Sequence, residues 1–116
     1  GKLKVFMILF LAVILIVLVV VCAKKIKLSQ NEKNIIGTWK NSNSENVITV
    51  QDSDTLILYN DIPEAGLYHG NASYHFSYTD TICVTQDDIS AEFCVDVDEN
   101  QLIIYFAGQV YLVLQK

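Results

Sequence analysis

The chain has 116 residues and a formal net charge of −5, with eight lysines, no arginine and thirteen acidic residues. From residue 28 onward three lysines accompany all thirteen acids, which gives 3 − 13 = −10 for this part. So acidic a surface repels phosphates, which excludes nucleic acid as a partner, and the length suits one small domain.

The N-terminal part is dominated by an apolar run from Val5 to Ala23, nineteen residues without a charge, amide or hydroxyl. As a helix rising ~1.5 Å per residue it is roughly 28 Å long, enough to cross a hydrocarbon core of about 30 Å. We therefore expect residues 1–27 to form a transmembrane anchor flanked by lysines, with the lipid bilayer as a partner. The short preceding tail favours a cytoplasmic N-terminus and an extracytoplasmic remainder in a single-pass cell-membrane protein.

Two other interpretations of the same run stay open. Lys2 and Lys4 precede it and a small residue, Ala23, ends it, as in a signal peptide that is cleaved to release a secreted protein. The segment ending at Cys22 is similar to a bacterial lipobox, which would make Cys22 a lipidated residue, although Val21 stands where the lipobox has a small residue. A cleaved signal typically has an apolar core of about 7–15 residues, so the greater length here favours the retained anchor.

After a polar segment, 28–34, which we expect to be a short stalk, the pattern over 35–116 is that of β-strands. Runs rich in Val, Ile, Thr, Tyr and Phe alternate with short polar turns. The eight predicted strands are 35–41, 45–51, 55–59, 67–78, 81–86, 91–97, 101–106 and 110–115. Eight short strands with tight connections predict an all-β antiparallel meander, which is either a small barrel or a sandwich.

Alternation in the fourth run places its aromatic residues on one face, Tyr68, Tyr74, Phe76 and Tyr78. The simplest interpretation is that these four rings belong to the core. The alternative is that they line a ligand pocket inside the barrel.

The fifth and sixth runs each carry one cysteine on the polar face, Cys83 and Cys94. A hairpin centred between Asp88 and Ile89 would place the two residues opposite one another. Cross-strand Cβ atoms lie about 4.5–5.5 Å apart, which a twisted hairpin can narrow to the ~3.8 Å typical of a disulfide. We therefore predict a disulfide on an oxidising side of the membrane, with two reduced thiols as the alternative.

No catalytic or cofactor motif is present. His69 and His75 are six residues apart, roughly 20 Å along a strand at ~3.3 Å per residue, so they cannot share a metal ion. The sequence contains neither HExxH nor CxxC, and no Gly-rich loop that opens a helix. We therefore expect no enzymatic activity, no metal and no cofactor.

The predicted β-domain opens with Ile-Ile-Gly-Thr-Trp-Lys over residues 35–40. Gly37 and Trp39 resemble the Gly-x-Trp opening of lipocalin-like barrels, and the domain looks most like the small lipocalin-like domains that Gram-positive bacteria tether outside the cell. The resemblance implies that Trp39 closes one end of the barrel. Lipocalins stack an arginine on this tryptophan, and this chain has no arginine.

These observations lead to two functional expectations. The first is a membrane-anchored extracytoplasmic binding or accessory module, a small subunit that contacts another membrane protein or a peptide. The alternative is a lipocalin-like carrier of a small apolar ligand at the membrane surface.

Overall fold

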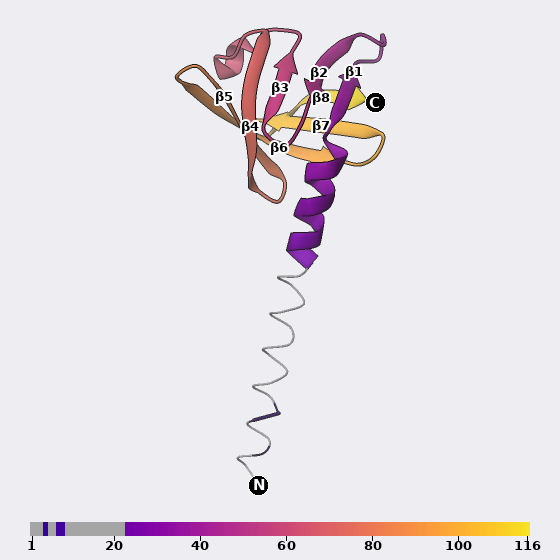
Figure 1. The fold of residues 1–116 in the computed structure, drawn as a ribbon, viewed down its shortest axis with the longest axis vertical. Helices are drawn as coiled ribbons and strands as arrows, with labels where there is room; N and C mark the ends of the chain where they lie inside the picture. The colour runs from indigo at the N-terminus through magenta and orange to yellow at the C-terminus, as the bar shows by residue number, and fades with distance from the viewer. Residues whose placement is uncertain (1–3, 5–6, 9–22) are drawn as a thin grey trace.

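The computed structural model describes residues 4, 7–8 and 23–116, and its main body is a closed antiparallel β-barrel in which each strand pairs with its sequence neighbours (Figure 1). The strands are β1 (Gly37–Lys40), β2 (Asn46–Val50), β3 (Thr55–Leu58), β4 (Gly70–Tyr78), β5 (Thr81–Gln86), β6 (Ile89–Val97), β7 (Gln101–Phe106) and β8 (Gln109–Gln115), with a 3₁₀ turn at Pro63–Ala65 between β3 and β4. The predicted all-β meander is confirmed, and of the two architectures it is the barrel that forms.

Aspartates fix two of the turns that separate the strands. Asp52 Oδ1 accepts hydrogen bonds from the backbone N–H groups of Asp54 and Thr55, at 3.0 and 2.9 Å. Asp98 Oδ1 does the same for the N–H groups of Asn100 and Gln101, at 2.8 and 2.7 Å. The first of these N–H groups is the main cause that lowers the pKa of Asp52 to about 2, and the corresponding bonds lower the pKa of Asp98. Both turns are therefore local structures that the sequence itself specifies.

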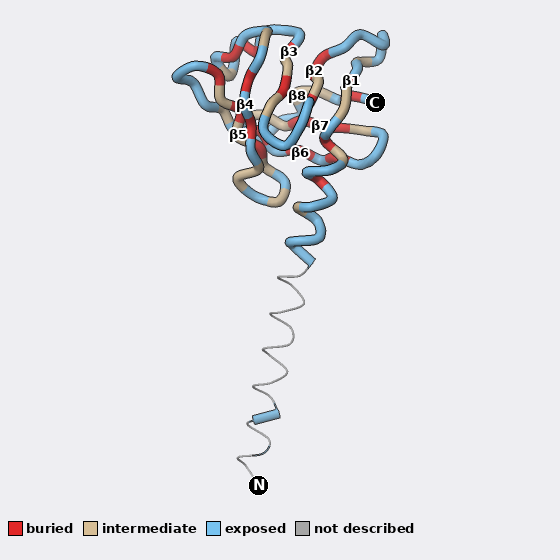
Figure 2. Tube along the Cα trace, in the orientation of Figure 1, coloured by how far each residue is buried: buried red, intermediate tan, exposed pale blue. Residues whose placement is uncertain are grey.

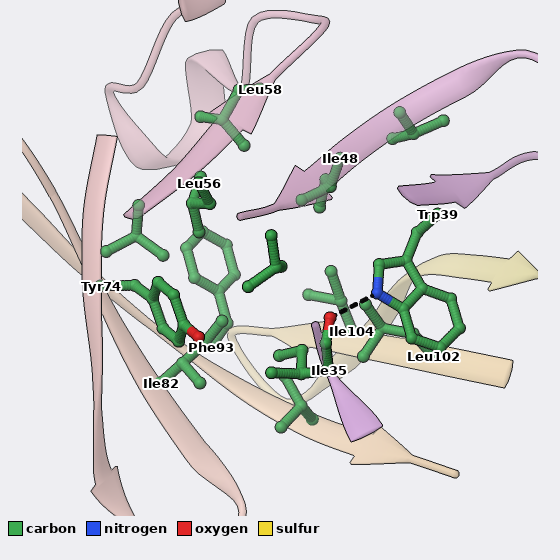
Figure 3. Close-up of a cluster of buried hydrophobic side chains, with 14 of the residues drawn as sticks. Ile35, Trp39, Ile48, Leu56, Leu58, Tyr74, Ile82, Phe93, Leu102 and Ile104 are labelled. Carbon is green, nitrogen blue, oxygen red and sulfur yellow. Dashed lines mark hydrogen bonds between the residues drawn. The ribbon is translucent and has the colours of Figure 1, made fainter. Parts of the chain in front are cut away.

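Buried and exposed residues alternate along the strands (Figure 2), and the buried side chains fill the barrel interior (Figure 3). In β5 and β6 the buried residues follow the predicted parity and include Ile82, Val84, Phe93 and Val95. Burying a Val, Leu, Ile or Phe side chain contributes ~1.5–3 kcal/mol, so this shared interior is the main source of stability.

A helix over residues 23–34 packs against the end of the barrel where β1 begins (Figure 1). Its Asn31 side chain is 2% exposed and donates through Nδ2 to the carbonyl of Thr79 in the β4–β5 turn, at 2.8 Å. Ile35 follows the helix directly and is 1% exposed within the core. Residues 28–34, predicted as a polar stalk, are thus helical and joined to the barrel.

Most of the predicted anchor, 1–27, lies outside the described residues, as does Cys22. Among the residues that the structure describes, no helix combines the length and the apolar character needed to span a bilayer.

Candidate functional site

The inside of the barrel contains almost no free space. Its interior cavity measures about 20 Å³ and is lined only by hydrophobic side chains and Tyr111, with no polar surface facing it. A water molecule needs roughly 10–15 Å³, whereas pockets for small organic ligands measure about 300–1,000 Å³. The described barrel therefore has room for about one water-sized molecule, in surroundings that offer it no hydrogen bond.

The prediction that four aromatic residues of the fourth strand share one inward face is wrong for Tyr68 and Tyr78. Tyr74 is 3% exposed and Phe76 is partly buried, but Tyr68 precedes β4 and is 45% exposed, while Tyr78 is 70% exposed. The register of the β4–β5 pair shifts between Phe76 and Tyr78, and this bulge turns Tyr78 to the outside. None of the four rings lines the interior cavity.

The predicted hairpin between the two cysteines has the wrong register. Gln86 pairs with Ile89, so the hairpin turns at Asp87 and Asp88, and Cys94 lies opposite Thr81 rather than Cys83. The two cysteines are consequently diagonal neighbours on the outer face, and both are free thiols. Diagonal pairs are about 7–8 Å apart, too far for a disulfide without backbone movement.

Trp39 lies beside the junction of the helix and the barrel. Its indole is fully buried, and Nε1 donates to the carbonyl of Ile35 at 2.8 Å (Figure 3). The ammonium group of Lys116 lies 5.1 Å from the centroid of the indole and donates to the carbonyl of Asn34 at 3.1 Å. Gly37 has a φ of +137°, and a Cβ atom there would lie 2.6 Å from Lys116 Cε, so a glycine leaves the space that this lysine occupies. These contacts tie the C-terminus to the end of the helix.

The barrel has an open seam between β1 and β8. β1 has four residues and β8 has seven, and the only paired positions between them are Lys40 and Gln115. Beyond Lys40 the chain leaves β8 to form the β1–β2 turn. Across from this free part of β8 is a groove of about 80 Å³, which we call the seam groove and which is lined by Val47, Ile48, Leu58, Asn60, Asp61, Ile62, Tyr111 and Leu112. Five of these residues also line the interior cavity, so the seam groove leads toward the core.

Carboxylates and tyrosine surround the seam groove. Tyr111 of β8 donates from its hydroxyl to Glu64 Oε2 at 3.0 Å, which bridges the seam to the 3₁₀ turn. Asp61 accepts hydrogen bonds from the backbone N–H and the Nδ1 atom of His69, at 2.9 and 2.7 Å, and the first of these is the main cause of its lowered pKa. Asp61 is therefore ionised at neutral pH, and no basic residue lines the groove.

The described residues contain no group of three or more His, Cys, Asp and Glu side chains able to hold a metal ion. His69 is bound to Asp61, and His75 lies on β4 opposite Cys83. Among the described residues, the one close contact of a histidine side chain with a carboxylate is the exposed His69–Asp61 pair.

Sequence reasoning did not find the seam groove, because its walls come from β2, β3, β8 and the β3–β4 connection. Its one sequence signal is the unbroken uncharged run of β8, Gln-Val-Tyr-Leu-Val-Leu-Gln, which lacks the charges that protect most edge strands. No protein-family model, curated protein or solved structure matches this chain, so its functional assignment depends on this geometry.

Proposed function

We propose that this protein is a membrane-anchored extracytoplasmic binding module, a small subunit that contacts another membrane protein or a peptide. The observation that carries the proposal is the contrast between a filled interior and an open apolar groove at the surface. Because the barrel is filled, a partner would bind to its outer surface. The exposed apolar residues of β8, Val110 and Val113, flank in sequence the two residues of this strand that line the groove.

Membrane attachment in this proposal is supported by the run from Val5 to Ala23, whose length matches the hydrocarbon core. The helix over 23–34 continues directly from that run to the barrel and carries Lys24, Lys25 and Lys27. Lysines at the end of an apolar run suit the membrane interface, because their ammonium groups can reach the polar head-group region.

The alternative is a carrier of a small apolar ligand, related to the lipocalin-like barrels that the Gly-x-Trp segment resembles. An apolar interior and a groove that leads toward it favour this alternative. A carrier would, however, need its barrel to expand, because about 20 Å³ is much less than the ~300 Å³ of a small ligand pocket. The small volume of the cavity therefore favours the binding module.

Purification of the full chain in mild detergent, followed by mass spectrometry of bound proteins and extracted lipids, tests the two functions. A binding module is recovered with a stoichiometric membrane protein or peptide, and a variant with the same apolar run in scrambled order serves as the control for association through the anchor alone. Recovery of a monomer with one apolar molecule per barrel would instead establish the carrier. The same spectra show whether Cys22 or the residue after Ala23 has become a terminus.

A further inference from the structure

We propose that the free edge of β8 is a site of β-strand addition that takes an extended segment of a partner polypeptide, with alternating apolar residues and a lysine or arginine near one end. This inference rests on the proposed binding function and names the surface and the chemistry of its partner.

The backbone of β8 has an unused side. Over residues 109–114 every position except Tyr111 pairs with β7, whereas the pairing of β8 with β1 is confined to Gln115. In an antiparallel strand, alternate N–H and C=O groups point to each side, so the side away from β7 presents donors and acceptors without a strand opposite. Sheet edges of this kind pair with added strands, and the main-chain hydrogen bonds supply much of the affinity.

Few of the usual protections against strand addition are present on this edge. β8 contains no proline and no charged residue, and Val110 and Val113 are 59% and 50% exposed. A register shift with β7 leaves Tyr111 as a bulge, which is the one protective feature. Tyr111 is itself held across the seam by Glu64, in an exposed hydrogen bond that an incoming strand can replace.

The seam groove provides the specificity that a bare edge lacks. It lies directly beside Tyr111 and Leu112 and is walled on its other side by residues of β2 and β3, Val47, Ile48 and Leu58. A volume of about 80 Å³ suits one aliphatic side chain, and alternate residues of an added strand point to the same face. A strand paired with β8 would therefore place every second residue toward an apolar wall.

The negative charges around the seam groove indicate which kind of peptide segment would pair with β8. Asp61 lines the groove and Glu64 lies at its rim, while the chain from residue 28 onward carries −10. A lysine or arginine in the added segment would meet these carboxylates at close range. A second copy of this chain would bring the same carboxylates and the same net charge to the interface, so electrostatics disfavours pairing of β8 with itself.

The probe for the test is a fluorescent peptide, acetyl-Lys-Val-Thr-Val-Thr-Val-Lys-amide, titrated against the full chain in detergent micelles. We expect saturable binding, at least about tenfold weaker affinity when both lysines of the probe are replaced by glutamate, and loss of binding when both threonines are replaced by proline. Hydrogen–deuterium exchange should show new protection confined to residues 109–114.

Two variants of the chain with matched controls locate the site. Val113→Lys places a charge on the free edge of β8 and should weaken the affinity for the probe at least about tenfold. Ile89→Lys, at another exposed aliphatic position, should change this affinity less than about twofold. Asp61→Asn should weaken binding of the lysine probe, while Asp96→Asn, which makes the same charge change on the outer face of β6, should not. Far-UV circular dichroism checks that each variant keeps the barrel.

Several results would overturn the inference. Equal binding of the proline probe would show that charge alone attracts the peptide, and protection outside residues 109–114 would place the site elsewhere. A dimer in sedimentation that Val113→Lys dissolves would show that β8 pairs with a second copy. If a membrane partner co-purifies equally well with Val113→Lys, the binding function stands and this surface is not its site, whereas recovery of a lipid-filled monomer would remove both proposals.

Discussion

The ammonium group of Lys116 lies 5.1 Å from the centre of the Trp39 indole, so the last residue of the chain covers the tryptophan of the first strand. The same ammonium donates to the carbonyl of Asn34 at 3.1 Å, at the C-terminal end of the helix, where a positive charge is favoured. This lysine provides the cation over the tryptophan for which the sequence offers no arginine.

Replacing Lys116 with methionine should lower the free energy of unfolding by about 1–2 kcal/mol, because it removes both the cation–π contact and the bond to the helix end. The measurement is urea unfolding in detergent, monitored by the fluorescence of Trp39, the single tryptophan. Lys40→Met is the control, because Lys40 is exposed and forms no side-chain bond among the described residues. Equal effects of the two substitutions would contradict a special role for Lys116.

Gly37→Ala should displace the Lys116 side chain, because the added Cβ would lie 2.6 Å from Lys116 Cε at a backbone φ of +137°. Gly70→Ala is the matched control, since its φ is +127° and no atom lies within 4 Å of its added Cβ. We expect Gly37→Ala to lower the free energy of unfolding by about 1 kcal/mol more than Gly70→Ala does. In a double-mutant cycle, Lys116→Met should add little once Gly37 has become alanine, and full additivity would show that the two sites are independent.

Asn31→Asp should detach the helix from the barrel. Asn31 donates to the carbonyl of Thr79, and an aspartate would bring an acceptor and a charge to the same 2% exposed position. We expect the free energy of unfolding to fall by at least about 2 kcal/mol and proteolysis over residues 23–34 to become faster. Gln30→Glu makes the same chemical change on an exposed position of the helix and should leave both properties nearly unchanged.

Thr81→Cys should create the disulfide that Cys83 and Cys94 do not form. Thr81 lies directly opposite Cys94, and its Oγ1 atom is 3.9 Å from Cys94 Sγ. In a Cys83→Ser background, the Thr81→Cys protein should oxidise and gain about 2–3 kcal/mol of stability. Thiol labelling should find both Cys83 and Cys94 reactive in the unmodified chain. A bridge between those two would contradict the observed register.

Tyr74 should ionise at a much higher pH than exposed tyrosines. Burial raises its pKa to about 12, and its hydroxyl donates to the carbonyl of Asp52 at 2.7 Å. The pKa of Tyr74 in the folded protein exceeds its value of about 10 in the unfolded chain. The stability that the buried neutral hydroxyl provides is therefore fully present below pH ~10 and disappears as the pH rises through ~12. Ultraviolet titration of the wild type and Tyr74→Phe should differ by one late-titrating group, and the lack of such a difference would contradict the burial of this hydroxyl.

The amino-acid sequence by itself determined the strand content, the order of the strands and most inward positions. These features depend on local chemistry: aspartates such as Asp52 and Asp98 bind the backbone of their own turns, and alternation in β5 and β6 separates apolar from polar residues. Such signals act over a few residues, so they can be recognised without knowing the rest of the fold.

Only the tertiary structure decided the register and the surfaces. The two-residue turn at Asp87, which has a φ of 53°, sets a register in which Cys94 lies opposite Thr81 and not opposite Cys83 as predicted. The bulge before Tyr78 points that ring to the outside and not inward as predicted. Register depends on the turn geometry and on which face of the pair is buried, and a shift of one residue turns every side chain of the strand to the other face. The Lys116–Trp39 contact and the seam groove join segments far apart in sequence, so a local pattern such as the uncharged run of β8 does not locate them, and they exist only once the whole barrel has closed.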